Sequence, residues 1–256
     1  MIYLKTDQEI NLMRDSSLLV SRTHAELAKV IKPGSNTLHL DQIAEEFIRD
    51  NGGIPGFKGY NGFPNTLCIS KDSAVVHGIP LDMEVEEGAI LSIDCGVLMN
   101  GFYGDAAYTF AVGEISAEKR RLLDVTKEAL NQGVLAAKSG NTVGDIGFSI
   151  QNFVESHGYS IVKELVGHGI GKNLHESPEI PNYGTKNSGL NLEPGMVLAV
   201  EPMVNIGTAD VIQNQDGWTI ETCDGLPSAH FEYTIAITKN KTEILSSFNL
   251  IEDNLN

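Results

Sequence analysis

The sequence predicts a mixed α/β (α+β) fold built from two related halves. Two observations lead to this prediction: an internal repeat, and signals for helix, helix and strand that recur in the same order in each half. In the repeat, Val85–Asp94 (VEEGAILSID) aligns without a gap with Leu192–Glu201 (LEPGMVLAVE). Collinear similarity of this kind is typical of a duplicated structural unit. We therefore expect a pseudo-twofold arrangement that brings Asp94 and Glu201 together.

Length and composition indicate one globular domain. The chain has 256 residues, of which 41% are hydrophobic and 20% charged, so it can bury a sizeable core. We expect a single domain over residues 1–256, with internal halves at about residues 1–113 and 114–256.

Charge and cysteine content limit the partners and the compartment. The net charge of −16 argues against stable binding to nucleic acid or to an anionic membrane, because both require a cationic surface. Acidic residues such as Glu176 could instead help to retain the amino terminus of a peptide. Three scattered cysteines do not form a disulfide framework, which favours a reducing cytoplasm. No stretch approaches a membrane span, and we expect no signal peptide.

Four helices are expected, two in each half. Thr6 and Glu9 have the spacing of a capping box and begin the first helix. Apolar residues at helical spacing over residues 40–48 predict the second. Ser116 and Thr142 are expected to begin the third and fourth.

The longest strand signal is a β-hairpin over Leu91–Phe110. Asn100-Gly101, between two apolar runs, is the dipeptide that most readily adopts a two-residue hairpin turn. With this turn Gly96 pairs with Asp105, and Asp94 lies on the same face because side chains alternate along a strand. The two carboxylates are then diagonal neighbours, roughly 7 Å apart at the backbone. They either lie on an ordinary solvated sheet face or bind cations, as in hydrolytic dinuclear sites.

The second half contains further candidate ligands. His168 lies between two glycines, where the backbone can turn sharply, and His175 follows seven residues later. The run His230–Thr238 alternates like one strand, so Glu232 becomes a ligand only if its face of the strand meets the hairpin. Four histidines lack such a setting and are expected to be ordinary surface or core residues: His24, His39, His157 and His230.

The candidate ligands form a set of four carboxylates and one imidazole: Asp94, Asp105, His168, Glu201 and Glu232. With this set, and over nearly its whole length, the chain resembles the type I methionine aminopeptidases. The motifs that carry the resemblance are His77-Gly78-Ile79-Pro80, Asp94 with Asp105 eleven residues later, Gly167-His168-Gly169 followed by His175, Glu201-Pro202, and Glu232. The resemblance implies the pita-bread fold, in which two pseudo-twofold-related α/β halves share a central antiparallel sheet with a dinuclear metal site between them.

The resemblance also implies a role for each ligand. Asp94 would chelate one divalent metal ion, His168 and Glu201 would hold the other, and Asp105 and Glu232 would bridge the two. Oxygen ligands with one imidazole suit Mn, Fe, Co or Zn ions, and the sequence does not choose among them.

The implied activity is hydrolytic removal of the initiator methionine from nascent proteins and peptides with a small second residue. We expect a metal-bridged hydroxide to attack the first peptide carbonyl. Glu201 would accept its proton and pass it to the leaving amine, while His77 and His175 would hydrogen-bond the substrate and the tetrahedral intermediate. The expected partner is the amino-terminal methionine of nascent polypeptides, with a transient ribosome contact and a monomeric enzyme.

The resemblance assigns an apolar pocket to the methionine side chain, since a thioether suits aromatic and sulfur-bearing walls. The pocket would draw on Tyr60, Phe63, Cys68, Leu174, Met203 and Trp218. Departures from the usual family pattern occur at Cys95, Leu174 and Tyr233. None of them removes a ligand, so they concern the shape of the pocket and the surroundings of the metals.

Two other functions agree with part of this pattern. An aminopeptidase P or prolidase would share the fold and the metals, but those enzymes usually carry a further amino-terminal domain. A catalytically silent binding protein on the same fold would recognise peptide ends or a partner protein, but such relatives typically lose ligands. Fold alone does not distinguish these functions.

Overall fold

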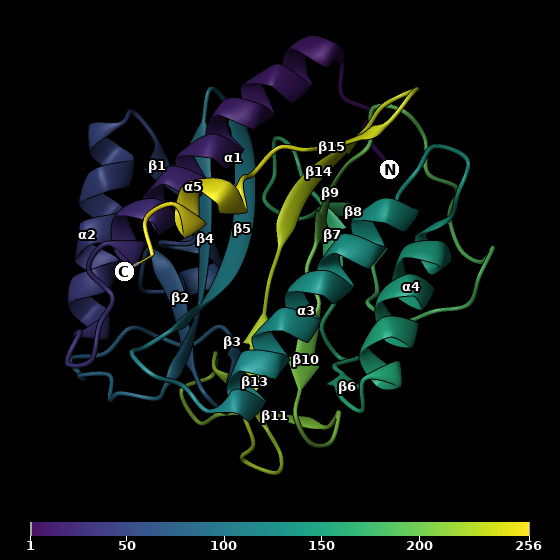
Figure 1. The fold of residues 1–256 in the computed structure, drawn as a ribbon. Helices are drawn as coiled ribbons and strands as arrows, with labels where there is room; N and C mark the ends of the chain where they lie inside the picture. The colour runs from purple at the N-terminus through teal and green to yellow at the C-terminus, as the bar shows by residue number, and fades with distance from the viewer. Residues whose placement is uncertain (1, 256) are drawn as a thin grey trace.

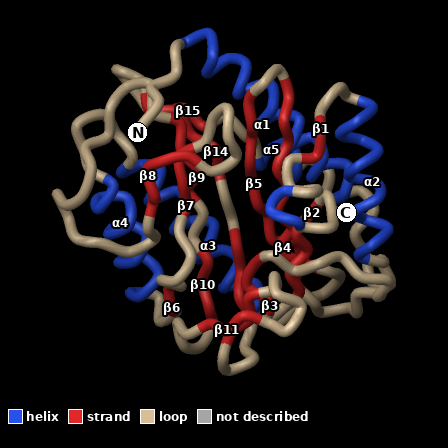
Figure 2. The backbone as a smooth tube through the Cα atoms, turned by 180° about the vertical axis from the view of Figure 1, so that it is seen from behind, coloured by secondary structure: helices blue, strands red, loops and turns tan. Residues whose placement is uncertain are grey.

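The computed structural model describes residues 2–255, and in it helices and sheets form separate layers (Figure 1). The first half is drawn in purple to blue-teal and most of the second half in teal to yellow, and they lie side by side, with the yellow carboxyl-terminal helix against the first half. In the view from behind, the strands lie in front of most of the helices (Figure 2). All strand pairs between the named strands are antiparallel. The predicted α/β class with antiparallel sheets is therefore confirmed. Over residues 2–255 there is no helix with the length and apolarity needed to span a bilayer.

The first half consists of two helices packed on a hairpin sheet. Its elements are α1 (Asp7–Ala28), α2 (Thr37–Asp50), β1 (Ile54–Pro55), the 3₁₀ helix η1 (Tyr60–Gly62), β2 (Leu67–Lys71), β3 (Ala74–Val76), β4 (Ile90–Met99) and β5 (Phe102–Ala111). β4 pairs with β1, β2 and β5, while β3 joins a small sheet with strands of the second half.

The second half repeats the pair of helices and adds more strands. Its elements are α3 (Ala117–Ala136), α4 (Val143–Ser156), β6 (Ser160–Ile161), β7 (Gly167–Gly169), β8 (Glu176–Ile180), β9 (Val197–Val200), β10 (Met203–Asn205), β11 (Val211–Gln213), β12 (Ile220–Thr222), β13 (Ser228–His230), β14 (Tyr233–Ile237), β15 (Thr242–Ile244) and α5 (Phe248–Glu252). The strands form sheets in the orders β15-β14-β9-β7-β8, β13-β10-β6 and β11-β12-β3.

The predicted helix starts are confirmed. Thr6 caps α1 with a capping box, in which its hydroxyl accepts from the Glu9 amide at 3.2 Å and its own amide donates to the Glu9 carboxylate at 2.9 Å. Ser116 accepts from an amide in the first turn of α3, and Thr142 begins α4 with a second capping box. These caps satisfy amides that a helix amino terminus leaves without intrahelical partners.

The two halves repeat local hydrogen bonds as well as elements. The amide of Gly34 donates to the carbonyl of Val85 at 2.8 Å, and the amide of Gly140 donates to the carbonyl of Leu192 at 3.0 Å. Both bonds connect the loop between the paired helices to the start of the repeated strand segment. The internal repeat thus has a structural counterpart, while the exact boundaries of the halves stay a prediction.

The hairpin has the predicted register. β4 pairs with β5 such that Gly96 lies opposite Asp105 and Met99 opposite Phe102, with Asn100 and Gly101 in the turn. Asn100 and Gly101 have φ values of 55° and 79°, the left-handed conformation that this turn requires.

The predicted continuous strand over 230–238 is wrong, because the chain changes sheets within it. β13 pairs with β10 and ends at His230, whereas β14 pairs with β9 and begins at Tyr233. Between them, the amide of Glu232 donates to the carbonyl of Ala107 in β5 at 2.9 Å. The break therefore turns Glu232 toward the hairpin. This is the orientation that the sequence analysis required for Glu232 to be a ligand.

Two threonine hydroxyls join the halves on either side of the hydrogen bond between Glu232 and Ala107. Thr234 accepts from the amide of Asp105 at 3.1 Å and donates to the carbonyl of the same residue at 2.7 Å. Thr109 accepts from the amide of His230 at 3.0 Å and donates to its carbonyl at 2.7 Å. Each hydroxyl thus takes the place of a strand partner, and the backbones of Asp105 and His230 are fixed across the seam.

Candidate active site and metal centre

A cavity of about 220 Å³ opens where the hairpin meets the strands of the second half. Asp94 and Asp105 come from β4 and β5, and His168 comes from β7. Glu201 directly follows β9, and Glu232 lies in the break between β13 and β14. The cavity is lined by Phe57, Tyr60, Asn61, Phe63, Cys68, His77, Asp94, Asp105, His168, Leu174, His175, Glu201, Trp218 and Glu232.

This lining includes every predicted ligand, both predicted substrate histidines and the predicted pocket residues except Met203. Met203 is fully buried in a cluster with Val75 and Val162, opposite His230 in the pairing of β10 with β13. The assignment of Met203 to the pocket stays a prediction.

Sequence reasoning missed Phe57 and Asn61, which also line the cavity. Gly96 in the hairpin is the residue that could have indicated a bulky neighbour such as Phe57. A Cβ atom on Gly96 would lie 2.5 Å from the Phe57 ring, so the ring occupies the space that the glycine leaves beside Asp105. The space opposite Asp105 that Gly96 leaves without a side chain is thus filled by an aromatic ring.

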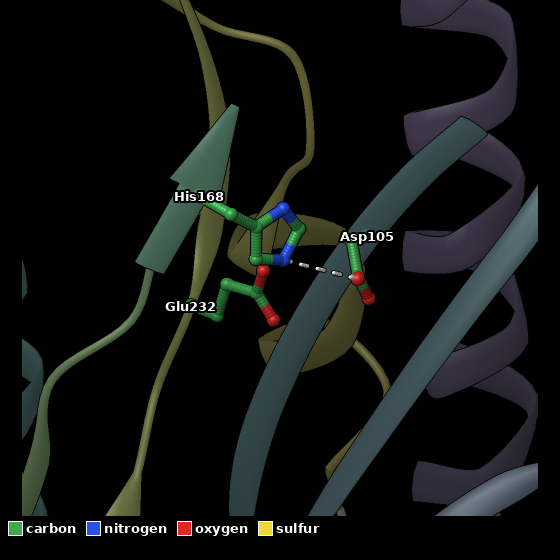
Figure 3. Close-up of side chains that lie close together, drawn as sticks. All are labelled: Asp105, His168 and Glu232. Carbon is green, nitrogen blue, oxygen red and sulfur yellow. Dashed lines mark ion pairs between the residues drawn. The ribbon is translucent and has the colours of Figure 1, made fainter. Parts of the chain in front are cut away.

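Asp105, His168 and Glu232 converge most closely. One ligand atom from each lies within 4.8 Å of the others, and all three side chains are buried. Figure 3 shows the imidazole of His168 directed toward Asp105, with the carboxylate of Glu232 next to it. The Nε2 atom of His168 is 4.0 Å from Oδ2 of Asp105 and 3.6 Å from Oε1 of Glu201.

The orientation of His168 leaves Nε2 free to bind a cation. Its Nδ1 lies 2.9 Å from the carbonyl oxygen of Gly169. A carbonyl only accepts, so Nδ1 carries the proton and Nε2 presents a lone pair to the carboxylates. A backbone hydrogen bond of this kind is how metal-binding histidines are usually oriented.

Burial raises the pKa of all four carboxyl groups. The pKa of Asp94 rises to about 7 and that of Glu201 to about 8. The pKa values of Asp105 and Glu232 rise well above the usual range, first through burial and then through repulsion from the neighbouring carboxylates. In the absence of a cation the cluster therefore retains protons at neutral pH, and binding a divalent cation would release them.

The donor set fits divalent metal ions. Asp94 Oδ1, Asp105 Oδ1 and Glu232 Oε1 are buried and have no hydrogen-bond partner among residues 2–255. Buried polar atoms normally have partners, and such exceptions indicate a bound ion or a functional site. Carboxylate oxygens with imidazole nitrogen suit first-row divalent metals.

The two predicted substrate histidines lie beside this cluster as neutral imidazoles. The ring of His175 contacts the ring of His168 edge-on at 4.3 Å between centroids, and its Nδ1 is 2.8 Å from the Tyr60 hydroxyl. His77 has a left-handed backbone with φ of 58°. Burial lowers the pKa of His175 and lowers that of His77 to about 4.

The apolar end of the cavity is formed mainly by aromatic rings. Phe63 contacts Trp218 edge-on at 5.1 Å between ring centroids, and Leu174 is buried beside them in the same hydrophobic cluster. Cys68 in β2 lies opposite Asp94 in β4, and burial raises the pKa of its thiol well above the usual range. Cys68 therefore contributes to the wall as a neutral thiol.

The expectation about Glu176 is corrected. Glu176 does not line the cavity and instead forms a buried ion pair with Lys5 at 2.7 Å, so it is not available to a substrate amine. His230 is a buried core residue, one of the two kinds of position expected for it, and it also lies beside the ligand cluster. Its Nε2 lies 3.6 Å from Oε2 of Glu201, and no local pattern in the sequence indicated this position because it results from the change of sheets after β13.

Comparison with known proteins agrees with this geometry. Residues 11–239 match the model of metallopeptidase family M24. Methionine aminopeptidase 1 of Bacillus subtilis (strain 168) is 50% identical over 246 residues, which cover 96% of this chain and 99% of that protein. The chain belongs to the methionine aminopeptidases of family M24.

Solved structures agree with this assignment to the family. The crystal structure of methionine aminopeptidase from Rickettsia prowazekii has a TM-score of 0.95 and 39% identity, and the match covers 96% of this chain and 100% of that one. Prolidase from Pyrococcus furiosus has a TM-score of 0.77 and 24% identity, over 95% of this chain and 65% of the prolidase. The likeness to prolidase concerns the fold alone, and the pita-bread fold predicted from the sequence is the one that these family members share.

Proposed function

We propose that this protein hydrolyses the first peptide bond of chains that begin with methionine. The observation that carries the proposal is the convergence, in one cavity, of four buried carboxyl groups, an imidazole oriented by the backbone and an apolar pocket of aromatic rings. Membership of the family supplies the reaction class, and the cavity supplies a polar end for the peptide bond and an apolar end for the side chain.

We assign two divalent metal ions to the polar end. Asp94 would hold one, His168 and Glu201 the other, and Asp105 and Glu232 would bridge them. Metal ions bound there lower the pKa of water and polarise a carbonyl group. The donor set suits Mn, Fe, Co or Zn ions.

The protein's own groups would orient the substrate and move the protons. Phe63, Trp218 and Leu174 would surround the methionine side chain and exclude water from the cavity. The Tyr60 hydroxyl can donate to Nδ1 of His175, which leaves the proton of this imidazole on Nε2. We assign to His77 and His175 the donation of hydrogen bonds to the carbonyl oxygen as it gains negative charge.

Glu201 is the proposed carrier of the proton. Its carboxylate lines the cavity among the other ligand groups, where it would accept a proton from the attacking water and return it to the leaving amine. A small second residue is expected because it must lie close to the ligand cluster.

The remaining assignments concern the cellular compartment, the oligomeric state and the contact with the ribosome. Free Cys68, Cys95 and Cys223 suit a reducing compartment, and we assign the protein to the cytoplasm, where nascent chains emerge. A monomer with a transient ribosome contact is the proposed working state, and the net charge of −16 disfavours a lasting contact with RNA.

The decisive experiment measures the release of free methionine from the peptide Met-Ala-Ser by metal-stripped protein, with Mn, Co, Fe or Zn ions added back. We expect metal-dependent release that an Asp105→Ala variant loses while remaining folded. Cleavage of an X-Pro peptide instead would assign the protein to the prolidase type. A folded protein that releases nothing with any metal would overturn the proposal in favour of a silent binding protein.

A further inference from the structure

Glu201 lies between two imidazoles rather than beside one. Its Oε1 is 3.6 Å from Nε2 of His168, and its Oε2 is 3.6 Å from Nε2 of His230. Both histidine side chains are buried, with relative exposures of 10% and 2%. The second imidazole thus occupies an equivalent place on the other side of the same carboxylate.

The distance from His230 to Glu201 is too long for a hydrogen bond. Within residues 2–255 the Nε2 atom of His230 has no hydrogen-bond partner. Leaving a buried ring nitrogen without a partner is destabilising, so such an atom calls for an explanation. Two atoms bound to one metal ion at about 2.1 Å lie roughly 3.0 to 3.5 Å apart at octahedral to tetrahedral angles, which is close to the observed separation.

The ring of His230 is held in this place by its backbone. Thr109 accepts from the amide of His230 at 3.0 Å and donates to its carbonyl at 2.7 Å. The Thr109 hydroxyl is itself 2.9 Å from the Ser92 hydroxyl in β4. A side chain on such a fixed backbone is already ordered before a ligand arrives, which is a requirement for a metal ligand.

Among the ion pairs of residues 2–255, no other candidate ligand lies as close to Oε2 of Glu201 as His230 does.

We propose that His230 is a further metal ligand: its Nε2 binds a metal ion on the Oε2 side of Glu201, while His168 binds the ion on the Oε1 side, so that Glu201 contacts both ions in addition to the bridging Asp105 and Glu232. This inference rests on the proposed function, because it assumes that the cavity holds two metal ions. Each ion then has one imidazole nitrogen among its ligands. A site with two nitrogen donors favours Co, Ni and Zn over Mn and Mg more strongly than a site with one.

The test compares metal binding by the wild type, by His230→Gln and by His24→Gln. His24 is the matched control, since it is also fully buried, and its Nε2 is 3.1 Å from the Ile93 carbonyl and away from the cavity lining. Metal-stripped proteins are titrated with Zn and with Co ions by calorimetry. We expect one of the two sites to weaken by about 100-fold or more in His230→Gln, beyond the range typical of residues that only orient a ligand, and both sites to be retained in His24→Gln.

X-ray absorption of the Zn-loaded wild type keeps the proposal testable even if the variant does not fold. An average of one imidazole per ion is expected, whereas half an imidazole per ion would overturn the proposal. Unchanged affinities in His230→Gln would overturn it as well. The outcome does not depend on peptide cleavage, so a wild type with two imidazoles that fails to release methionine would refute the proposed function and leave the ligand assignment intact.

Discussion

The buried ion pair between Lys5 and Glu176 is expected to hold His175 in place, although the two charged residues are 171 positions apart. Nζ of Lys5 is 2.7 Å from Oε2 of Glu176, and the side chains are 5% and 4% exposed. Oε1 of Glu176 accepts from the amide of Asn173 at 3.1 Å. Lys5 is itself anchored, because its amide donates to the carbonyl of Gly195 at 2.7 Å. The segment that carries His175 is therefore tied to a fixed cation.

Replacing Lys5 by Met would leave the Glu176 carboxylate buried with the Asn173 amide as its remaining partner. Removing one member of a buried pair destabilises a protein by about 3–5 kcal/mol, because the other charge is left uncompensated. We expect a loss of this size in urea denaturation, and a fall in kcat/KM for Met-Ala-Ser because His175 is released from its position.

The control is Lys58→Met, which breaks a pair with Glu45 whose side chains are 43% and 22% exposed. Exposed pairs contribute at most about 1 kcal/mol, so this variant should remain close to wild type. A double variant, Lys5→Met with Glu176→Met, removes both buried charges and should recover most of the stability. The reasoning is refuted if Lys5→Met is no less stable than Lys58→Met, or if the double variant is as unstable as Lys5→Met alone.

Two further predictions concern the cavity itself. His77→Ala and His175→Ala should each lower kcat/KM by about 100-fold or more, since removal of one oxyanion donor has an effect of this size. Their metal content, measured by atomic absorption, should stay at the wild-type level. Loss of metal in proportion to the loss of activity would instead make these histidines ligands. The metal-free protein should lose stability as pH rises from about 6.5 to 8, because the folded state keeps protons on groups such as Asp94 and Glu201, whose pKa values are about 7 and 8, and the unfolded state does not. Each carboxyl group that stays protonated in the folded state lowers the free energy of unfolding by about 1.4 kcal/mol for every unit that the pH rises. Below pH 6.5 the buried histidines, whose pKa values are lowered, have the opposite effect: they raise the free energy of unfolding as the pH rises. Urea denaturation at three pH values measures the slope, which saturating metal should abolish; a flat metal-free profile would contradict the assignment.

The features that the sequence predicted correctly are those with local chemical causes. The hairpin register follows from one dipeptide, because Asn100-Gly101 allows a single two-residue turn. The helix starts follow from caps that lie within four residues of the groups they satisfy. The set of candidate ligands came from motifs whose order along the chain is that of a known family.

The features that it missed depend on which strands become neighbours. His230 and Met203 lie opposite each other in the pairing of β13 with β10. Nothing in the sequence of either strand indicates how this pair is oriented relative to the boundary between the two halves. The break after His230 arises because the Glu232 amide finds a partner in β5, more than a hundred residues earlier. The Lys5–Glu176 pair joins the start of the chain to a distant loop, so charge pattern alone assigned Glu176 to the wrong partner.

Small residues decide how the carboxylates of the hairpin can act together. In the register of β4 and β5, the residue opposite Asp94 is Ala107 and the residue opposite Asp105 is Gly96. Directly paired residues share a face, so larger side chains at these positions would stand between the two carboxylates. The Phe57 ring takes the space beside Gly96, and burial of the carboxyl groups raises their pKa values. A metal centre at this point of the fold therefore requires two small residues and one ring as much as it requires the carboxylates, and a search for ligands alone would not recover them.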